Sequence, residues 1–246
     1  MNAHPPIYVI NMAQDVERMV SMAQQLDAQG LRYERVDAIV GRQLSPQQRR
    51  ASLSKFWYYF FMGRVPSDGE LVCTLSHRLV WKMMLDRGQQ WAVIFEDDAL
   101  LSPTFASQFA MFEKATTAYD VVHFFSLNQP SIIKDNYFDQ EFRLMAYAGA
   151  NTTATAYGLR MAGAKKLLKY KPVIFTNDKW VMARALLGVK CIAIIPFPVA
   201  MHVSHSVHST IGDEGSTKRQ GALLWRITLL PILRLVRTVV LKIRGI

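Results

Sequence analysis

The first forty residues contain the pattern that most restricts how this chain can fold. An apolar, β-branched run, IYVIN, predicts a strand that ends at Asn11. Apolar residues then recur at helical spacing from Asp15 to Gly30, which is expected to act as the C-cap. A second strand is expected over residues 32–39. A strand, a helix and a strand in so short a stretch are typical of a parallel α/β layer of the nucleotide-binding type.

Later segments continue this alternation. The expected elements are a helix over residues 69–88 that leads into the strand of WAVIFEDD, a helix from the Ser102–Pro103 N-cap pair to about residue 118, a strand over 120–127, a strand turning into a helix in TTATAYGLRMAGAKKLL, and a strand over 191–197. The polar stretch after residue 127, up to residue 140, is predicted to be a mobile loop. The aromatic run FWYYFF at 56–61 is interpreted as a helix that packs on the core, with an aromatic binding platform as the alternative.

Composition limits the class of protein and its partners. With 246 residues and 50% hydrophobic content, the chain can form one large α/β domain or two small ones. The formal charge of +10 indicates an anionic partner, which can be nucleic acid, an acidic membrane surface or a phosphorylated substrate. Cys73 and Cys191 have apolar neighbours and no CxxC spacing, so buried free thiols in a reducing cytoplasm are expected. No signal peptide is recognised, and the protein is expected to stay inside the cell.

The C-terminal segment, residues 216–246, differs in kind from the rest of the chain. Charged residues interrupt it too often for a solitary membrane-spanning helix. At about 100° per residue, one side of a helix here is cationic and the other carries Leu, Ile, Val and Trp. The cationic side is formed by Arg219, Arg226, Arg237 and Arg244. This pattern is typical of a helix in a membrane interface; the alternative is a terminal helix packed on its own domain. A folded domain over residues 1–215 is expected to precede this segment.

The buried run AVIFEDD ends on three carboxylates, Glu96, Asp97 and Asp98, although the chain is basic overall. Adjacent like charges repel, and holding them out of bulk water is costly unless a cation compensates. In an open parallel sheet, ligands bind beyond the carboxyl ends of the strands. Asn11 and Asp37 are also expected at strand ends, so one cleft can collect all of these side chains.

Strand alternation predicts which of the three carboxylates act together. On an extended segment Glu96 and Asp98 share one face and Asp97 takes the other. Two hard oxygen donors on one face suit Mg²⁺ or Mn²⁺, which complete their shells with water and substrate phosphates. One alternative is that a bend after Phe95 directs Asp97 to the metal instead, and another is that the triplet forms an N-cap and a surface turn.

A second cluster of potential metal ligands follows the last expected strand and contains His202, His205 and His208. Spacings of three do not bring all three to one face of a strand, and no cysteine accompanies them. A loop that lines the substrate cleft is therefore favoured over a zinc site. Phosphate-loop, dinucleotide-binding and nucleophile-elbow motifs are not found, which disfavours kinase, dehydrogenase and serine hydrolase activities.

Several blocks occur in order between about residues 7 and 212: IYVINMAQDVERMVSMAQQL, YERVDAIVG, GELVCTLSHRLVWKMML, WAVIFEDDALL, TATAYGLRMAGAKKLL, the Asp of FTND, and HSTIG. Together they resemble glycosyltransferase family 25, the family of lipooligosaccharide galactosyl- and glucosyltransferases. The resemblance implies a GT-A-type, Rossmann-like α/β fold with a mostly parallel sheet flanked by helices. It also implies inverting transfer of a hexose, with galactose favoured over glucose, from a UDP-sugar to a lipid-linked oligosaccharide of the lipopolysaccharide type. A divalent metal, Mn²⁺ or Mg²⁺, is implied as the cofactor.

The resemblance also implies roles for individual residues. Asn11 and Arg18 are placed near the nucleotide. Glu96, Asp97 and Asp98 correspond to the family's DxD motif for metal and UDP, with the first and last of them expected on the metal and the middle one on the donor. Further site candidates from the resemblance are Asp37 at the donor, and Glu70, Ser76, His77, His205 and Ser209. The chain departs from the family pattern at two positions without losing a polar group, and these are Met12 for Leu and Val72 for Gly.

Asp178 corresponds to the late acidic position of the family. An inverting displacement needs a base for the acceptor hydroxyl on the side of the sugar away from the diphosphate. Asp178 is the candidate because it is far in sequence from the metal motif; the alternative is a helix N-cap. Glu70 and His77 either line the site or have a structural role in the preceding helix.

Two other functions remain compatible with the sequence. One is a metal-dependent nucleotidyl- or phosphotransferase. The other is a non-catalytic, membrane-bound sugar or nucleic-acid binder, which the acidic triplet and the lack of an organised basic-aromatic stripe disfavour. The favoured hypothesis is therefore a hexosyltransferase that binds no nucleic acid and lies on the inner face of the cytoplasmic membrane.

Overall fold

The computed structural model describes residues 4–137, 141–147 and 152–202. The strands of this part of the chain are β1 (Ile7–Asn11), β2 (Glu34–Asp37), β3 (Trp91–Glu96), β4 (Ala99–Leu101), β5 (Val121–His123), β6 (Ile132–Tyr137), β7 (Arg143–Ala146), β8 (Ala156–Arg160), β9 (Cys191–Ile195) and β10 (Val199–Met201). The helices are α1 (Val16–Ala28), η1 (Gly41–Gln43), α2 (Pro46–Ser52), α3 (Lys55–Met62), α4 (Asp68–Asp86), α5 (Phe105–Ala115), α6 (Met161–Leu167) and α7 (Trp180–Leu187).

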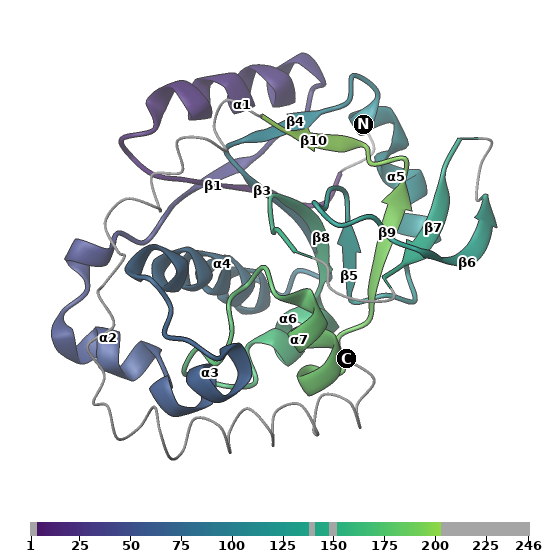
Figure 1. The fold of residues 1–246 in the computed structure, drawn as a ribbon. Coiled ribbons are helices and arrows are strands. Elements are labelled where there is room, and N and C mark those ends of the chain that lie inside the picture. Colours follow the sequence, from purple (N-terminus) through teal and green to yellow (C-terminus); the bar gives the residue numbers. More distant parts are fainter. Residues whose placement is uncertain (1–3, 138–140, 148–151, 203–246) are drawn as a thin grey trace.

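A central sheet of eight strands, in the order β2-β1-β3-β8-β5-β9-β7-β6, organises the fold (Figure 1). β1 is parallel to both β2 and β3, and β5 is parallel to β9. β8 runs antiparallel to β3 and β5, and β7 runs antiparallel to β9 and β6. Among the described strands of this sheet, all except β7 and β8 therefore point the same way. The predicted α/β class with a mostly parallel sheet is confirmed, and the antiparallel β8 has consequences for the site.

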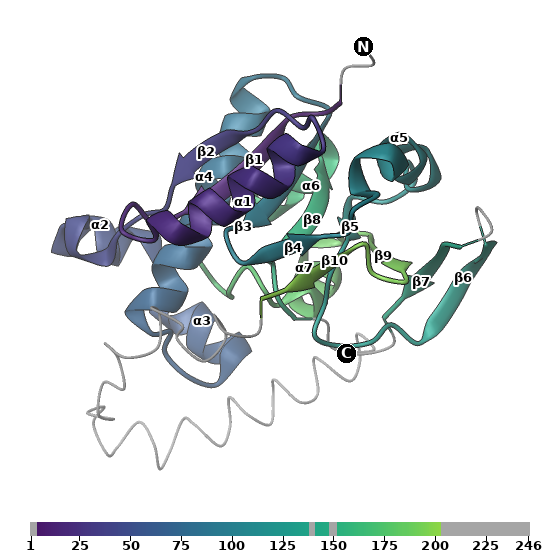
Figure 2. The same cartoon turned by 90° about the horizontal axis from the view of Figure 1, so that it is seen from above.

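Helices cover both faces of the sheet, as Figures 1 and 2 show. On one face, α1 and α5 pack against the side chains of β1 and β3 that alternate toward them, with Met22, Leu26, Phe105 and Phe112 fully buried. On the other face, α4, α6 and α7 pack against the opposite side chains of the same strands. Both sides of β1 and β3 are thus buried, which explains why these strands read as almost unbroken apolar runs.

Helix α4 starts at a well-defined cap. Ser67 accepts a hydrogen bond at its Oγ from the backbone N–H of Glu70 (3.2 Å), and its own N–H donates to Glu70 Oε2 (2.9 Å). This capping box satisfies backbone donors that the first turn leaves without partners. It fixes where α4 begins, and so which residues of α4 face the end of the sheet.

Several sequence expectations were wrong in detail. The stretch expected to be a mobile loop contains β6, and β7 follows it as its antiparallel partner. Helix α5 begins at Phe105 with Thr104 at the cap position, so Ser102 is not its N-cap. The short strands β4 and β10 were not expected, because they pair with each other across the chain and neither has a local sequence pattern of its own. The C-cap of α1 is Gln29 rather than the predicted Gly30, which follows it with φ +67°.

The membrane-associating segment proposed for residues 216–246 lies outside the described residues, as do His205 and Ser209. Among the helices that are described, none combines the length and the apolar character needed to cross a bilayer.

Candidate functional site

A cleft of about 260 Å³ opens at the carboxyl ends of β1 and β3. It is lined by residues of these strands and the turns after them, by the first turn of α1, and by the amino-terminal half of α4. Asn11, Arg18 and the three carboxylates of the acidic triplet all line it, as do Ser76 and His77. The prediction that strand ends gather Asn11 and the acidic triplet in one cleft is therefore confirmed, whereas Asp37, which was included in it, does not line the cleft.

The acidic triplet does not continue the strand. β3 ends at Glu96, and the chain turns at Asp97 and Asp98 before β4 begins. Strand alternation therefore does not govern the last two carboxylates, and the predicted pairing of Glu96 and Asp98 on one face has no basis in this geometry. All three line the cleft through the turn instead.

Asp97 is held by residues from the start of the chain. Asn11 Nδ2 donates to Asp97 Oδ2 (2.7 Å), and an Arg18 guanidinium nitrogen lies 3.5 Å from Asp97 Oδ1. Burial raises the pKa of Asp97, while the Asn11 hydrogen bond and the Arg18 charge act in the opposite direction. The Asn11 amide is itself oriented, because its oxygen accepts from Arg35 Nε (2.8 Å). These contacts link the ends of β1, β2 and β3.

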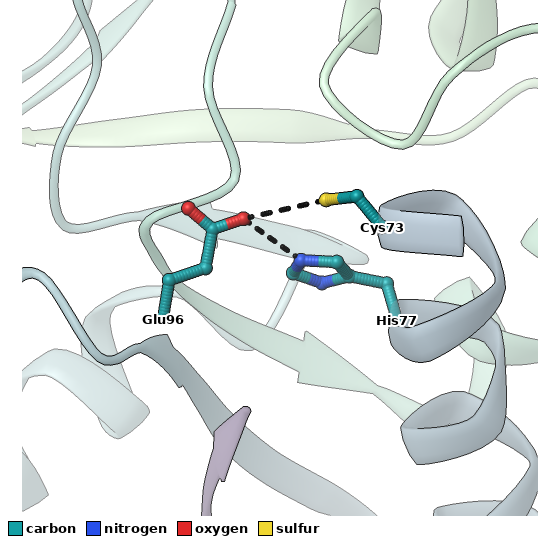
Figure 3. A group of neighbouring side chains, drawn as sticks. All are labelled: Cys73, His77 and Glu96. Atoms are coloured by element: carbon teal, nitrogen blue, oxygen red, sulfur yellow. Dashed lines mark hydrogen bonds and ion pairs between the residues drawn. The ribbon is translucent and has the colours of Figure 1, made fainter. Parts of the chain in front are cut away.

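Glu96 points to the opposite side, toward α4 (Figure 3). Its Oε1 lies 3.0 Å from His77 Nε2 and 3.9 Å from Cys73 Sγ. Its Oε2 accepts from the Thr155 hydroxyl at 3.3 Å. Both carboxylate oxygens are therefore held by donors of the protein.

The hydrogen-bond network around His77 determines which ring nitrogen carries the proton. Trp81 Nε1–H can only donate, and it donates to the Tyr157 hydroxyl (2.8 Å). Tyr157 is fully buried, and among the described residues the sole acceptor for its O–H is His77 Nδ1, at 2.8 Å. His77 Nδ1 thus accepts, Nε2 carries the proton, and Nε2–H donates to Glu96 Oε1.

Asp98 is the carboxylate of the triplet with an unsatisfied oxygen. Within the described part of the chain, its Oδ1 is buried and has no hydrogen-bond partner. Burial, followed by the charges of Glu96 and Asp97, raises the pKa of Asp98 to about 7. A buried oxygen without a donor, next to two further carboxylates, is an arrangement that a cation would stabilise.

Two different donor sets could hold a metal ion here. The ligand atoms of Cys73, His77 and Glu96 all lie within 4.8 Å of one another. Binding through this set would have to displace the proton from His77 Nε2 and one from the Cys73 thiol, whose pKa is raised by burial and by the charge of Glu96. The carboxylates of Glu96 and Asp98 offer hard oxygen atoms, which fit Mg²⁺ or Mn²⁺ better than a thiol and an imidazole do.

Asp37 and Ser76 occupy the edges of the predicted site. The Asp37 carboxylate is 75% exposed, pairs with Arg35 (2.7 Å), and is not among the residues that line the cleft. Ser76 lines the cleft, but its Oγ donates to the Val72 carbonyl (2.7 Å) and accepts from the Ile39 N–H (2.8 Å). These bonds join α4 to the chain after β2.

Glu70 has a structural environment. Besides the capping box, its carboxylate accepts hydrogen bonds from both terminal guanidinium nitrogens of Arg64. Glu70 is not among the cleft-lining residues. Of the two hypotheses for Glu70, lining the site or a structural role in the helix, the structure supports the structural role in α4.

Asp178 lies on the loop before α7 and pairs with Lys179 at 2.8 Å. It is not the N-cap of α7, since Lys179 holds that position. The loop is tied to α4, because Asn177 N–H donates to Thr74 Oγ1 (3.3 Å). The Asp178 charge contributes to the raised pKa of Cys73, so Asp178 lies within electrostatic reach of the cleft.

Sequence reasoning missed Thr155, Tyr157 and Met201. Because β8 is antiparallel to β3, its first residues rather than its last ones lie at the cleft, and the Thr155 carbonyl accepts from Glu96 N–H (2.8 Å). Met201 reaches the cleft through β10. Directly after it, His202 N–H donates to the Asp98 carbonyl (3.0 Å), so the chain enters the histidine-rich segment beside the triplet. A fully parallel sheet would place the last residues of β8 at the cleft, which is why the first ones were not predicted there.

Comparisons with known proteins identify the family of the chain. The family model for glycosyltransferase family 25 (LPS biosynthesis protein) matches residues 4–181. A glycosyltransferase 25 family member of Aedes aegypti is 29% identical over 177 residues, which cover 68% of this chain and 28% of that protein. The inactive glycosyltransferase 25 family member 3 of Homo sapiens is 27% identical over 174 residues, covering 68% of this chain and 29% of that protein. The match thus spans only a minor part of each relative's length. Since the family model spans residues 4–181, well over half of the chain, this chain belongs to glycosyltransferase family 25.

Proposed function

We propose that the chain is an inverting hexosyltransferase that moves galactose, or alternatively glucose, from a UDP-sugar to a lipopolysaccharide-type, lipid-linked acceptor. The observation that carries this proposal is the convergence of Glu96, Asp97 and Asp98 with Asn11 and Arg18 in one cleft. A nucleotide diphosphate and a divalent cation would complement such a set, because the carboxylates would hold the cation and the cation would neutralise phosphate charge.

Glu96 and Asp98 are the residues proposed to hold Mn²⁺ or Mg²⁺. The unpartnered Asp98 Oδ1 supports this assignment, since a buried carboxylate oxygen is stable only with a donor or a cation. When bound, the metal would neutralise charge that develops on the departing diphosphate. The protein contributes the orientation of Glu96, which His77 and Thr155 hold through separate oxygens.

The donor side is proposed to involve Asn11, Arg18 and Asp97. Asn11 fixes the direction of the Asp97 carboxylate, and the Arg18 guanidinium adds positive charge at the cleft. Positive charge near the nucleotide favours binding of an anionic donor. Asp37 belongs to this proposal only through Arg35, which pairs with it and donates to Asn11.

Asp178 is the proposed base for the acceptor hydroxyl. Its carboxylate is 34% exposed, so an acceptor can reach it from solvent. The hydrogen bond between Asn177 and Thr74 holds its loop against α4 beside the cleft. Lys179 is the counter-ion of Asp178, at 2.8 Å.

The proposed location is the inner face of the cytoplasmic membrane. It rests on the basic amphipathic pattern of residues 216–246 and on the lipid-linked nature of the proposed acceptor.

The decisive experiment incubates the full chain with a panel of UDP-sugars, Mn²⁺ or Mg²⁺, and lipid-linked oligosaccharide acceptors, and measures released UDP together with the glycosylated product. Metal-dependent UDP release that requires acceptor supports the proposal. Release of pyrophosphate, or transfer of phosphate, would instead establish a nucleotidyl- or phosphotransferase. Since some relatives are named inactive, binding of a UDP-sugar without turnover over the whole panel would identify a sugar-binding protein.

A further inference from the structure

The segment between β2 and α4, here called the excursion, contributes no strand to the sheet and forms a separate surface. It consists of η1, α2 and α3, which lie together at one end of the molecule in both views, away from β6 and β7 (Figures 1 and 2). Ala38 and Ile39, just before the excursion, line the cleft, and so do Gly69 and Val72, just after it. Whatever this segment binds is therefore brought close to the opening of the site.

Helix α3 has two distinct faces. Tyr58 points inward, is fully buried, and packs with Leu71 and Val173. The opposite face carries Phe56 and Trp57, which are 50% and 48% exposed. One face of the aromatic run therefore packs on the core, as predicted. The other face is partly exposed, as the alternative of an aromatic binding platform requires.

The exposed Phe56 and Trp57 form one continuous cluster with the half-buried Phe60 and Phe61. The Trp57 ring lies 5.1 Å from Phe56, 5.8 Å from Phe60 and 5.9 Å from Phe61, and Phe60 lies 5.2 Å from Phe61. Val65, 57% exposed, follows shortly after α3. Single exposed apolar side chains are ordinary on a protein surface, but a contiguous aromatic cluster indicates a binding surface.

The segment that carries this cluster is basic in sequence. Between Asp37 and Asp68 the sequence contains no Asp or Glu. It contains the cations Arg42, Arg49, Arg50, Lys55 and Arg64. Arg49 pairs with Asp68, and Arg64 pairs with Glu70. Within the described part of the chain the other three cations form no ion pair, and all three are exposed.

We propose that this aromatic-basic surface, formed by Phe56, Trp57, Phe60 and Phe61 with Arg42, Arg50 and Lys55, docks on an anionic phospholipid bilayer. Aromatic side chains are favoured at the level of the lipid headgroups, where their apolar rings leave water and their edges stay near polar groups. Each nearby Lys or Arg adds attraction to lipid phosphates. Charge complementarity favours an anionic membrane over a second copy of this chain, since the surface is basic on both copies.

The surface belongs to the folded body and is separate from the membrane contact proposed for residues 216–246. Docking through it would place the cleft next to the bilayer, where a lipid-linked acceptor is found. Only this consequence rests on the proposed function. Binding itself is measured without donor, acceptor or metal, so its failure and the failure of hexosyl transfer can be told apart.

The first test measures co-sedimentation of the full chain with phosphatidylethanolamine vesicles that contain phosphatidylglycerol. The variant Phe56→Ser/Trp57→Ser should bind about tenfold more weakly, because two aromatic side chains no longer enter the interface. The matched control is Val16→Ser/Val20→Ser, which removes two similarly exposed apolar side chains (61% and 49%) from α1 and should bind like the native chain. Unchanged binding of the aromatic variant would overturn the proposal and leave the membrane contact to another segment.

The second test follows Trp57 directly. The other tryptophans of the described residues, Trp81, Trp91 and Trp180, are buried, so Trp57 is the one expected to respond to lipid. Its emission should shift to the blue on addition of the same vesicles, and Trp57→Phe should lose most of that shift while still sedimenting with them. An equal shift in Trp57→Phe would assign the response to Trp225 and contradict insertion of α3.

The third test measures the contribution of the cationic side chains and checks whether a second copy of the chain occupies the surface instead. Arg42→Gln/Arg50→Gln/Lys55→Gln should weaken binding to phosphatidylglycerol vesicles and reduce its salt dependence. Equal binding of the native chain to vesicles of phosphatidylcholine alone would refute the electrostatic part. Sedimentation equilibrium without lipid provides the remaining outcome, since a native dimer that Phe56→Ser/Trp57→Ser converts to monomer would assign the surface to a second copy.

Discussion

His77 Nε2 donates a hydrogen bond to Glu96 Oε1 over 3.0 Å, and the buried pair Trp81 and Tyr157 determines that this nitrogen carries the proton. His77 is therefore a positioning residue for a carboxylate of the cleft. The chain of donors runs from a core tryptophan to the acidic triplet without reversing direction. It connects the packing of α4 and β8 to the orientation of one proposed metal ligand.

The first prediction concerns His77. His77→Leu removes the donor to Glu96 and leaves the Tyr157 hydroxyl without an acceptor, so Mn²⁺ affinity measured by calorimetry should fall about tenfold. His77→Gln keeps an N–H donor and should recover most of that affinity. Nitrogen-15 NMR of the metal-free native chain should show neutral His77 with its proton on Nε2. A proton on Nδ1, or native Mn²⁺ affinity in His77→Leu, would refute the positioning role.

The second prediction concerns the stability of the metal-free protein as a function of pH. The pKa of Asp98 is about 7 in the folded state, above its value in the unfolded chain. The folded state therefore holds the proton more tightly than the unfolded state does. As a result, the free energy of unfolding falls as pH rises from about 4 to above 7. Asp98→Asn should remove this loss and be roughly 2–4 kcal/mol more stable than native at pH 8 in the presence of a chelator. The two proteins should converge in stability near pH 4. Denaturant unfolding at both pH values measures this difference, and native-like pH dependence in the variant would contradict it.

The same residue gives a third prediction for metal binding. Asp98→Ala should abolish metal-dependent UDP-hexose turnover and weaken Mn²⁺ binding, because one of the two proposed ligands is lost. Circular dichroism should show a folded chain. Full activity together with native Mn²⁺ affinity would exclude Asp98 from the metal site.

The fourth prediction separates the base from the donor pocket. Asp178→Asn keeps the size of the side chain but cannot accept a proton at neutral pH, so kcat should fall by about 10²–10⁴ with little change in UDP affinity. Asn11→Ala should show the opposite pattern, with weaker UDP binding because Asp97 loses its donor. Asp37→Asn serves as a control at the exposed edge and should have a smaller effect than Asn11→Ala. If Asp178→Asn lowered only UDP affinity, Asp178 would belong to the donor pocket.

The fifth prediction concerns Glu70. Glu70→Ala removes half of the capping box and the partner of Arg64, and should cost about 1–2 kcal/mol of unfolding free energy. UDP affinity of the folded variant should remain native, because Glu70 does not line the cleft. Native stability with lost UDP binding would place Glu70 in the site instead.

Local patterns were sufficient to predict the elements that build most of the cleft. β1, α1, α4 and β3 bury side chains at a regular period, and that period is visible in the sequence. The rule that ligands gather at strand ends then brought Asn11 and the acidic triplet together. Contacts formed between distant segments could not be found this way, and Thr155, Tyr157 and the pairing of β4 with β10 belong to that group.

The sequence by itself thus determined that three carboxylates follow a buried strand of an α/β domain, because apolar periodicity and residue identity are local properties. Only the tertiary structure decided how those carboxylates are used. The turn after Glu96 ends the strand alternation, the antiparallel β8 brings Thr155 and Tyr157 to the cleft, and α4 directs His77 at Glu96. Direction in space depends on which strands pair and which helix faces pack, and these depend on residues far apart in the chain.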